Sequence, residues 1–489
     1  MTAHAPSRLH ASAAELAGLL ATAPDLRRGD ALDAILGILA GRRAMDLSDL
    51  DPRAQAELIA ARAARLLPGV EQLTAMLTAA RDENRALTVK FGIDPTAADV
   101  HVGHTVPMIL AARFQRMGHR VVFIVGDVTA RIGDPSGRSG ERPPLTDEDV
   151  RRNLATYRSQ VSPFFDFARA EFRFNGEWLG QVTLPRLLGV LEKLPASAAL
   201  QREDFRSRLA EGSGLTMAEL VYSVVMALDS VEIDADVELG GIDQLLNMQM
   251  CRRVMENAGR VPELIVATGL IEGTDGTGAK MSKSKNNYVA LAGAPADVFG
   301  KLMSAADRLL PDYLRALTEL LDPEVDLLLE GMRDKRIHPM GVKTLLAADV
   351  TATIHGARAA NEARDAFRAQ FSQRRYSQAS GVTAISVAVH GDATVGAAFV
   401  TLVGTVASMK QVRRVARDGG LRLVVEDAAG SGTETSAIAG RQQAVLGAAD
   451  ADKTIADLLA EREIAPAARV FLRCGRQLVE LTRGRVDDR

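Results

Sequence analysis

The sequence predicts an α/β protein with a doubly wound, mostly parallel sheet, followed by a helical region and a small α+β region. Short apolar runs at 87–91 and 121–125 enclose a longer amphipathic stretch at 105–117. Such alternation of strands and helices is typical of parallel sheets. Beyond about residue 296 the β-type runs give way to helical periodicity. In a sheet of this kind, ligands bind beyond the carboxyl ends of the strands.

The expected elements follow in chain order. Residues 1–80 are Ala/Leu-rich with periodic apolar positions, which predicts helices. Strands are expected at 87–91, 121–125 and 263–267, a helix at 105–117 and a loop at 133–137. Further helices are expected at 296–305, 312–321, 325–332, 341–355 and 359–371. Residues 377–384 have the composition of a linker, and the final part combines β-type runs at 421–425 and 470–473 with a polar insertion at 430–435.

The composition is that of an ordinary globular protein, with a net charge of −3 that argues against a uniformly basic nucleic-acid binder. Two cysteines, Cys251 and Cys474, provide neither a disulfide framework nor a metal-ligand cluster, so no protein-bound metal is expected. We find no apolar run long enough for a membrane helix and no signal-peptide pattern. A cytoplasmic protein that does not enter a membrane is therefore expected.

Two short motifs carry the chemistry. His101-Val102-Gly103-His104 opens the amphipathic stretch, and Lys280-Met281-Ser282-Lys283-Ser284 follows a Gly/Asp-rich loop. Histidines at i and i+3 lie on one face of a helix start, where backbone N–H groups and the helix dipole favour anions. The two motifs together resemble the paired ATP-binding elements of class I aminoacyl-tRNA synthetases, and this resemblance implies an ATP site. Lysines on a loop could then stabilise the charge that builds on a departing pyrophosphate.

Each motif alone also has a simpler interpretation. An isolated His-x-x-His is more often a surface pair or half of a metal site, and a loop rich in lysine and serine is more often a solvated turn. The occurrence of both motifs, in this order and context, favours the functional interpretation.

Further segments are in register with these motifs, namely Lys-Phe-Gly-Ile-Asp-Pro-Thr at 90–96, Gly-Asp-Pro-Ser-Gly-Arg at 133–138 and Glu-Leu-Gly-Gly-Ile-Asp-Gln at 238–244. Together they resemble the tyrosyl-tRNA synthetases, a family of class I aminoacyl-tRNA synthetases, over about 80–375. The resemblance implies a Rossmann-like catalytic domain at 81–295, a helical anticodon-binding-like domain at 296–377 and a divergent S4-like RNA-binding domain at 378–489. Residues 1–80 would form an N-terminal helical extension.

The resemblance assigns an ATP-binding set position by position. The residues expected to act on the phosphates are Thr96, His101, His104, Lys280 and Lys283, the two lysines when their loop closes. The residues expected around the rest of the nucleotide are Gly103 beneath the adenine, Asp243 at the ribose, and Ser282 and Ser284 in the lysine loop. Mg²⁺ would be held by the phosphates of ATP rather than by a protein cage.

The resemblance also assigns an amino-acid-binding set, consisting of Lys90, Asp94, Asp134, Tyr222, Met226, Asp229 and Gln244. Asp134, Tyr222 and Gln244 match groups around the substrate's ammonium and carboxylate, and Asp229 matches the acceptor of tyrosine's phenolic hydrogen. A site that bonds a substrate hydroxyl rejects the analogue lacking it by roughly 10⁴- to 10⁵-fold. The simpler interpretations are a surface acid for Asp229 and core packing for Tyr222.

Position 226 departs from the family, which usually shows Tyr-x-x-x-Gln-x-x-Asp on this helix. Here Met226 stands between Tyr222 and Asp229, and methionine cannot replace an amide hydrogen bond. The pocket is expected to be more apolar at this point, so Met226 bears on the identity of the amino acid.

The C-terminal region resembles the S4 RNA-binding motif at 408–420. Lys410, Arg413, Arg414 and Arg417 are the expected RNA contacts; a solvated arginine-rich surface is the alternative. The Asn-Gly that customarily follows the next strand is absent, and an insertion at about 428–462 separates the last strand.

With the resemblance, these residues predict a homodimeric enzyme that activates tyrosine with ATP and transfers it to tRNA(Tyr). Two alternatives stay open at this point. One is a paralogue that activates a non-standard amino acid for secondary metabolism, and the other is a non-enzymatic RNA-binding or regulatory protein.

Overall fold

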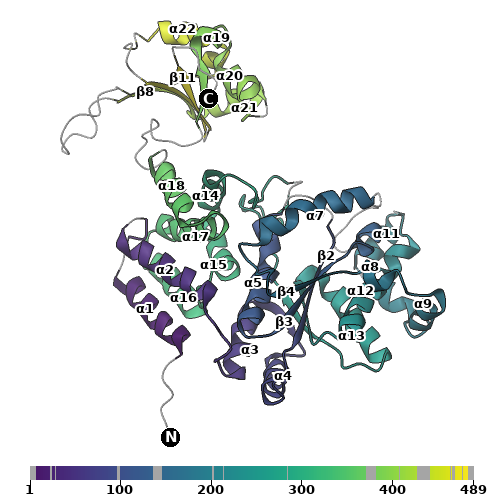
Figure 1. Cartoon of the computed structure of the whole chain (residues 1–489). Helices are drawn as coiled ribbons and strands as arrows, with labels where there is room; N and C mark the ends of the chain where they lie inside the picture. Colours follow the sequence, from purple (N-terminus) through teal and green to yellow (C-terminus); the bar gives the residue numbers. More distant parts are fainter. Residues whose placement is uncertain are drawn as a thin grey trace. The chain divides into compact units, whose positions relative to one another are not determined.

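The computed structural model describes residues 7–482 apart from 23–24, 28, 96–99, 136–145, 201–202, 213, 283–284, 370–381, 407, 427–440, 463, 465–468 and 476. The chain divides into two compact units, Met1–Asn361 and Glu362–Arg489 (Figure 1). Each unit is described by itself, and the finer four-way division stays a prediction. Among the described residues, no helix has the length and apolar character needed to cross a membrane.

The first unit is built on a six-stranded sheet (Figure 1). Its strands are β1 (Ala63–Leu67), β2 (Thr88–Ile93), β3 (Arg120–Val125), β4 (Ala170–Phe174), β5 (Val237–Gly241) and β6 (Leu264–Thr268). They lie in the order β1-β6-β5-β2-β3-β4. Strand β1 runs antiparallel to β6, and the other neighbouring pairs are parallel. The predicted mostly parallel sheet is confirmed.

Strand β1 corrects the prediction of an all-helical N-terminal segment. Its sequence, Ala-Ala-Arg-Leu-Leu, has helical propensity, yet Arg65, Leu66 and Leu67 pair with Ala267, Val266 and Ile265 of β6. Pairing with a sheet edge outweighs weak local propensity here.

Helices cover both faces of the sheet, as the burial of β3 shows. Val122 and Ile124 pack against Trp178 and Ile233, whereas the Phe123 ring, on the opposite face, contacts Tyr157. Because both faces are buried, β3 has the continuous apolar sequence Val-Val-Phe-Ile-Val.

The helices of this part are α1 (Arg8–Thr22), α2 (Asp30–Ala44), α3 (Pro52–Ala60), α4 (Val70–Asp82), α5 (Val102–Arg116), α6 (Thr129–Ile132), α7 (Asp147–Val161), α8 (Gly176–Leu179), α9 (Leu184–Leu191), α10 (Ala196–Leu200), α11 (Glu203–Ala210), α12 (Met217–Ile233) and α13 (Leu245–Asn257). The predicted helix at 105–117 is α5, which begins three residues earlier because His101 caps it.

The helical region after the sheet consists of α14 (Pro295–Met303), α15 (Leu310–Leu317), α16 (Asp322–Arg333), α17 (Pro339–His355) and α18 (Ala357–Phe367). All five predicted helices are present with shifted ends. Helix α15 ends at Leu317 rather than 321, because Thr318 has extended backbone angles and a new helix starts at Asp322. Proline stands in the first turn of α14 to α17, where its missing N–H costs nothing.

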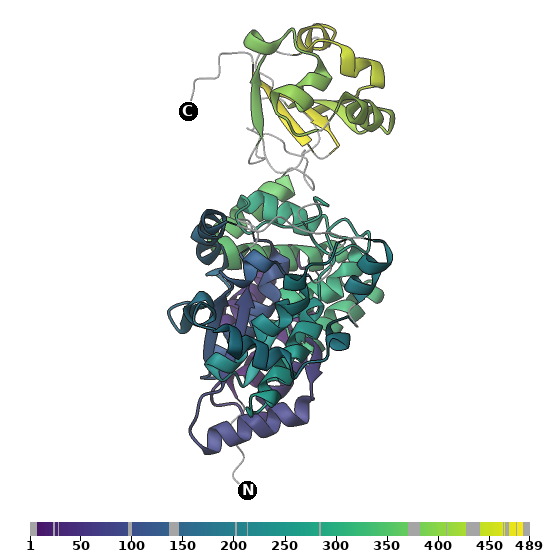
Figure 2. The same ribbon diagram turned by 90° about the vertical axis from the view of Figure 1, so that its right-hand side faces the viewer.

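The second unit contains a five-stranded sheet in the order β7-β11-β10-β8-β9. Its elements are β7 (Thr383–Ser386), β8 (Leu421–Glu426), β9 (Arg441–Val445), β10 (Arg469–Cys474), β11 (Gln477–Thr482), α19 (Val387–His390), α20 (Val395–Ala397), α21 (Met409–Arg417) and α22 (Ile455–Ala460). Its helices gather on one side of the strands (Figure 2), where residues such as Phe399, Ile455 and Leu472 form its core. The runs predicted at 421–425 and 470–473 are β8 and β10.

Two predictions about this unit are corrected. Residues 383–386 belong to β7 rather than to a linker, and they pair with β11. The segment at 428–462 is not a simple insertion, because β9 pairs with β8 and Leu458 of α22 lies in the core. The polar residues 430–435 lie outside the described residues, as do 377–381.

Candidate active site

The predicted residues meet in one cavity of about 370 Å³ at the carboxyl ends of β2, β3 and β5. The residues that were predicted for the site and that line this cavity are Lys90, Asp94, His104, Asp134, Tyr222, Met226, Asp229, Asp243, Gln244 and Lys280. A larger cavity of about 600 Å³ lies between α2, α5 and residues 162–169 and contains none of them. Thr96, Lys283 and Ser284 lie outside the described residues.

The two histidines form the start of α5. His101 is the N-cap residue; its Nδ1 accepts the Gly103 N–H at 3.1 Å, and Nδ1 of His104 accepts the His101 N–H at 3.2 Å. The rings lie 3.8 Å apart between centroids. A Cβ at position 103 would stand 2.9 Å from the His101 ring, which explains a glycine between the histidines.

These hydrogen bonds determine which nitrogen of His104 carries a proton. Burial, aided by the Lys280 ammonium, lowers the pKa of His104 to about 4, so the ring is neutral at pH 7. Since Nδ1 accepts a hydrogen bond, the single proton resides on Nε2. His104 therefore presents an N–H donor rather than a full positive charge.

The lysine loop reaches the histidines through backbone pairing. Val102 N–H donates to Val289 O at 3.0 Å, and Leu291 N–H donates to Val100 O at 2.9 Å. Residues that follow the lysine motif are thereby fixed beside the start of α5. This contact brings two motifs that are distant in the sequence to one site.

Within the described part of the loop, Lys280 and Ser282 are placed differently. The ammonium of Lys280 pairs with Asp243 Oδ2 at 2.7 Å and is about half exposed. The backbone N–H of Ser282 donates to Asn287 Oδ1 at 2.8 Å. Asp243 follows β5 in a short 3₁₀ turn, Ile242–Gln244, so the predicted ribose residue and a predicted phosphate residue are already in contact.

Helix α12 carries three predicted residues on one face, because Tyr222, Met226 and Asp229 are spaced by four and three positions. Thr216 and Glu219 form a capping box that fixes the start of this helix. The Tyr222 hydroxyl donates to Asp94 Oδ2 at 2.8 Å. Burial raises the pKa of Asp94 to about 7, so this carboxyl group titrates near neutrality.

A second carboxylate, Asp134, is held by two amides. Gln244 Nε2 donates to Asp134 Oδ2 at 2.6 Å, and Asn247 Nδ2 donates to Oδ1 at 3.3 Å. Asp94 and Asp134 thus line the same cavity as two fixed acidic groups. A cationic group such as an ammonium is the complementary ligand.

Asp229 is buried rather than on the surface. Trp178 Nε1 donates to its Oδ1 at 2.8 Å, and Asn175 Nδ2 donates to its Oδ2 at 3.3 Å. Burial raises its pKa to about 6, so it is mostly ionised at pH 7. Sequence analysis missed Trp178 and Asn175, although an Asn-Gly pair directly after β4 marks the carboxyl end of a strand.

Met226 is half-buried and lines the cavity. It packs against a cluster that includes Val224, Ala227 and Met250. Its thioether supplies no N–H donor or amide oxygen to a ligand, so this wall of the cavity is apolar as predicted.

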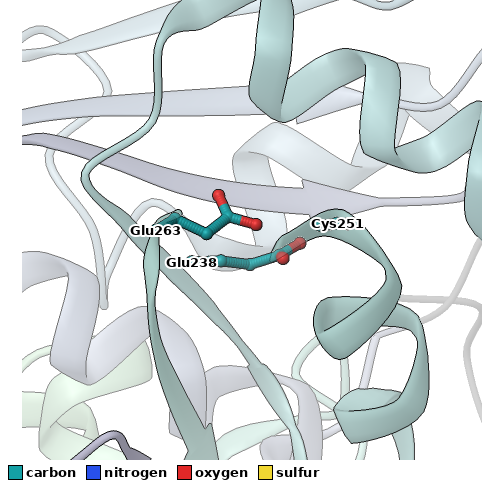
Figure 3. A group of neighbouring side chains, drawn as sticks. All are labelled: Glu238, Cys251 and Glu263. Carbon is teal, nitrogen blue, oxygen red and sulfur yellow. The ribbon is translucent and has the colours of Figure 1, made fainter. Parts of the chain in front are cut away.

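Lys90 lies in a buried polar group at the edge of the cavity. Its ammonium contacts Glu238 Oε1 and Ser230 Oγ, each at 2.7 Å. Glu238, Cys251 and Glu263 stand side by side (Figure 3) with potential ligand atoms within 4.8 Å of one another. The Lys90 ammonium already provides the cation that such a group requires. From the sequence, Glu238 belongs to the motif at 238–244 and Glu263 to the strand expected at 263–267, but neither was predicted as a site residue.

The predicted RNA contacts lie on α21 of the second unit. Lys410, Arg413, Arg414 and Arg417 are all exposed, while Val412 and Ala416 are buried. Arg413 pairs with Asp452 at 2.7 Å. The helix therefore presents a basic face to solvent, with its apolar face in the core.

Comparison with known proteins identifies the family of this chain. The family described as tRNA synthetases class I (W and Y) matches residues 82–372. A tyrosine–tRNA ligase of Thermotoga maritima is 41% identical over 300 residues, which cover 61% of this chain and 75% of that protein. One from Aquifex aeolicus is 37% identical over 352 residues, covering 72% and 87%.

Solved structures show the same fold. A C-terminally truncated mitochondrial tyrosyl-tRNA synthetase of Aspergillus nidulans superposes with a TM-score of 0.54 at 19% identity, covering 70% of this chain and 99% of that chain. A tyrosyl-tRNA synthetase of Archaeoglobus fulgidus, complexed with L-tyrosine, superposes with a TM-score of 0.51 at 20% identity, covering 63% and 99%. The chain therefore belongs to the class I tRNA synthetases, and within them to the tyrosine–tRNA ligase family.

Proposed function

We propose that this protein activates tyrosine with ATP and transfers the tyrosyl group to tRNA(Tyr). The observation that carries the proposal is a single cavity that His104 and Lys280 line together with Asp94, Asp134 and Asp229, while the His101 ring lies against that of His104. One part suits a triphosphate, and the other suits an ammonium and a phenol.

In the first step, the tyrosine carboxylate attacks the α-phosphorus of ATP, and pyrophosphate leaves. No side chain forms a covalent bond. The helix start at His101, the Nε2–H donor of His104 and the Lys280 ammonium stabilise the charge on the departing group. In the second step, a ribose hydroxyl at the tRNA 3′ end attacks the acyl carbonyl, and AMP leaves.

Mg²⁺ would be bound by the phosphate oxygens of ATP rather than by the protein. Asp243 can accept a ribose hydroxyl only when Lys280 releases it, because the two are paired at 2.7 Å. The ion would neutralise charge on the pyrophosphate. Opening of the Lys280–Asp243 pair is therefore an expected consequence of nucleotide binding.

Three further residues retain the roles that the resemblance implies. Thr96, Lys283 and Ser284 are proposed as phosphate and ATP contacts, beside Ser282, whose backbone position is fixed by Asn287. The RNA-binding role of Lys410, Arg413, Arg414 and Arg417 is proposed on the basic exposed face of α21. We also propose that the enzyme works in the cytoplasm, where ATP and tRNA are found.

A homodimer is proposed from exposed apolar side chains on α9 and α12. Leu184, Leu188 and Met217 are 67%, 53% and 74% exposed, although α9 packs on α12 through Val190 and Leu191. Exposed apolar groups of this size are typical of interfaces. Met217→Asp is expected to give monomers in sedimentation experiments, whereas Val261→Asp, at another exposed apolar position, leaves the dimer intact.

Tyrosine-dependent exchange of pyrophosphate into ATP, followed by charging of total tRNA, tests the proposed function. Exchange and charging with tyrosine are both expected. Exchange with a different amino acid only, or binding of RNA without exchange, would contradict it. These outcomes correspond to the secondary-metabolism paralogue and the non-enzymatic RNA-binding protein, neither of which gains support from the comparisons.

A further inference from the structure

The buried polar group around Lys90 adjoins the part of the cavity where Asp229 lies. Lys90, Glu238 and Asp229 all line the cavity, and all three are at least 97% buried. Glu263 directly precedes β6 and lies next to Glu238. Ser230 Oγ donates to Glu263 Oε1 at 3.0 Å. The group joins β2, β5 and α12 beneath the substrate site.

The charges of this group balance only if one of the two glutamates is protonated. Two carboxylates facing one ammonium would leave a buried negative charge, which is costly. Glu238 Oε2 and Glu263 Oε2 are buried without a donor from another residue, so a proton shared between them satisfies both. Burial and the Glu238 charge raise the pKa of Glu263 well above its usual range, which identifies Glu263 as the neutral acid.

Glu238 is the ionised partner of Lys90. Burial opposes its ionisation, but the Lys90 charge and the hydrogen bonds from Lys90, Glu263 and Cys251 together outweigh burial and hold the pKa of Glu238 below its usual range. The result is a fixed ion pair beside a neutral carboxylic acid. Among the described residues this is the arrangement that most resembles a metal site, yet the Lys90 ammonium already contacts two of its members, Glu238 at 2.7 Å and Cys251 at 3.9 Å.

We propose that Lys90 is a positioning residue for tyrosine selection, whose ammonium, held by Glu238 and Ser230 at the edge of the cavity, supplies a positive charge that favours the ionised form of the Asp229 carboxylate. Glu263 serves as the neutral hydrogen-bond donor that keeps Glu238 in place. This inference rests on the proposed function, because it concerns how the same site distinguishes tyrosine from phenylalanine.

Several groups face Asp229 and must be considered together. Trp178 and Asn175 donate hydrogen bonds to it. Burial raises its pKa, the Lys90 charge acts in the opposite direction, and Glu238 raises it to a smaller extent. Asp94 and Tyr222, which also line the cavity, interact electrostatically with it as well.

The ratio of kcat/KM for tyrosine over phenylalanine, measured by pyrophosphate exchange between pH 5 and 8, isolates Asp229. Both substrates have the same ammonium and carboxylate, so titration of Asp94 largely cancels from the ratio. An ionised Asp229 accepts the phenolic hydrogen more strongly than a protonated one. The ratio is expected to fall as the pH decreases through about 6.

Three variants are expected to shift the midpoint of this profile with different signs. Lys90→Met removes the positive charge of the ammonium and should raise the midpoint of the pH profile by about one pH unit. Glu238→Gln removes a negative charge and should lower the midpoint by a smaller amount. Glu263→Gln imitates the neutral acid in shape and hydrogen bonding, so it is the matched control and should leave the midpoint unchanged.

The sign pattern separates this proposal from a purely structural role. If Lys90→Met does not fold, the combined Lys90→Met and Glu238→Gln variant replaces it, because it removes both charges of the ion pair. The midpoint of the combined variant is still expected to rise, because Lys90 influences the pKa of Asp229 more than Glu238 does. Equal shifts in all variants, or none, would overturn the proposal, as would a stoichiometric divalent metal ion in the purified wild-type protein. Failure of wild-type exchange with tyrosine would instead overturn the proposed function.

Discussion

At the scale of single residues, His101 and His104 combine a structural and a chemical task. His101 Nδ1 accepts the Gly103 N–H in the first turn of α5, as a Ser or Asp cap would, and His104 Nδ1 accepts the N–H of His101 itself. The Nε2–H of His104 is thereby directed to a ligand. A neutral histidine at a helix start adds a donor without a charge that must be desolvated.

His104→Ala is expected to lower the rate of adenylate formation by roughly 10²-fold, because a donor aimed at developing charge is lost. His104→Gln retains an N–H donor and should be less impaired. Single-turnover measurements of adenylate formation test both. Since the pKa of His104 is about 4, its contribution to the rate of adenylate formation should be constant between pH 6 and 8. A fall in the rate with a midpoint near pH 6.5, present in the wild type and absent in His104→Gln, would contradict the assigned protonation state.

Met226, which lines the cavity, is expected to affect amino-acid affinity. A charge-assisted hydrogen bond is worth about 1.5–3 kcal/mol, so an amide at this position would bind the tyrosine ammonium more tightly by about 10- to 100-fold. Met226→Gln is therefore expected to lower the tyrosine KM in pyrophosphate exchange, with Met226→Leu as the apolar control. Unchanged KM and unchanged selectivity among tyrosine analogues in Met226→Gln would show that this wall does not face the ammonium.

At the scale of elements, the N-terminal helices α1 and α2 pack against α16 and α17. Buried ion pairs join them, with Arg42 to Glu324 at 2.6 Å and Arg43 to Asp349 at 2.8 Å. Glu324 also accepts the Leu321 N–H at 2.7 Å at the start of α16. The extension is thus tied to the region that follows the catalytic sheet.

Arg42→Met should destabilise the protein by about 3–5 kcal/mol, because Glu324 is left buried and unpaired. The combined Arg42→Met and Glu324→Gln variant removes both charges and should recover much of that loss. Urea unfolding of the three proteins measures the difference. Arg53→Met, which breaks exposed pairs with Glu57 and Glu71, is the control and should change stability little; an equal loss in the control would contradict the interpretation.

At the scale of the whole molecule, the cavity lies entirely within the first unit, Met1–Asn361. The second unit has its own sheet and its own core. Activation of the amino acid and contact with RNA are therefore expected to be separable.

A chain that ends at Phe367, the last residue of α18, should keep pyrophosphate exchange but bind tRNA more weakly. The salt dependence of tRNA affinity should also become less steep, because phosphate contacts of α21 are lost. Filter binding at several salt concentrations measures this. The full chain with Lys410, Arg414 and Arg417 changed to Gln is the matched comparison, and unchanged tRNA affinity in both would mean that the second unit does not contact RNA.

Features with short-range causes were predictable from the sequence alone. The strands β2 and β3 and the helix after the histidine motif follow from apolar periodicity, whereas the common helix of Tyr222, Met226 and Asp229 was implied by the family resemblance. The five helices after residue 295 were predictable for the same reason, and their ends shifted where caps and prolines act locally.

Contacts between segments distant in the chain were decided by the tertiary structure. Strand β1 exists because an edge of β6 is available to pair with it, against the helical propensity of its residues. Lys90 was expected at the substrate, but its ammonium is bound by Glu238 and Ser230, and Asp229 is bound by Trp178 and Asn175. Local spacing determines which face of an element a side chain occupies, whereas the partner across that face depends on how distant elements pack, and it is this packing that sets the charge of buried groups.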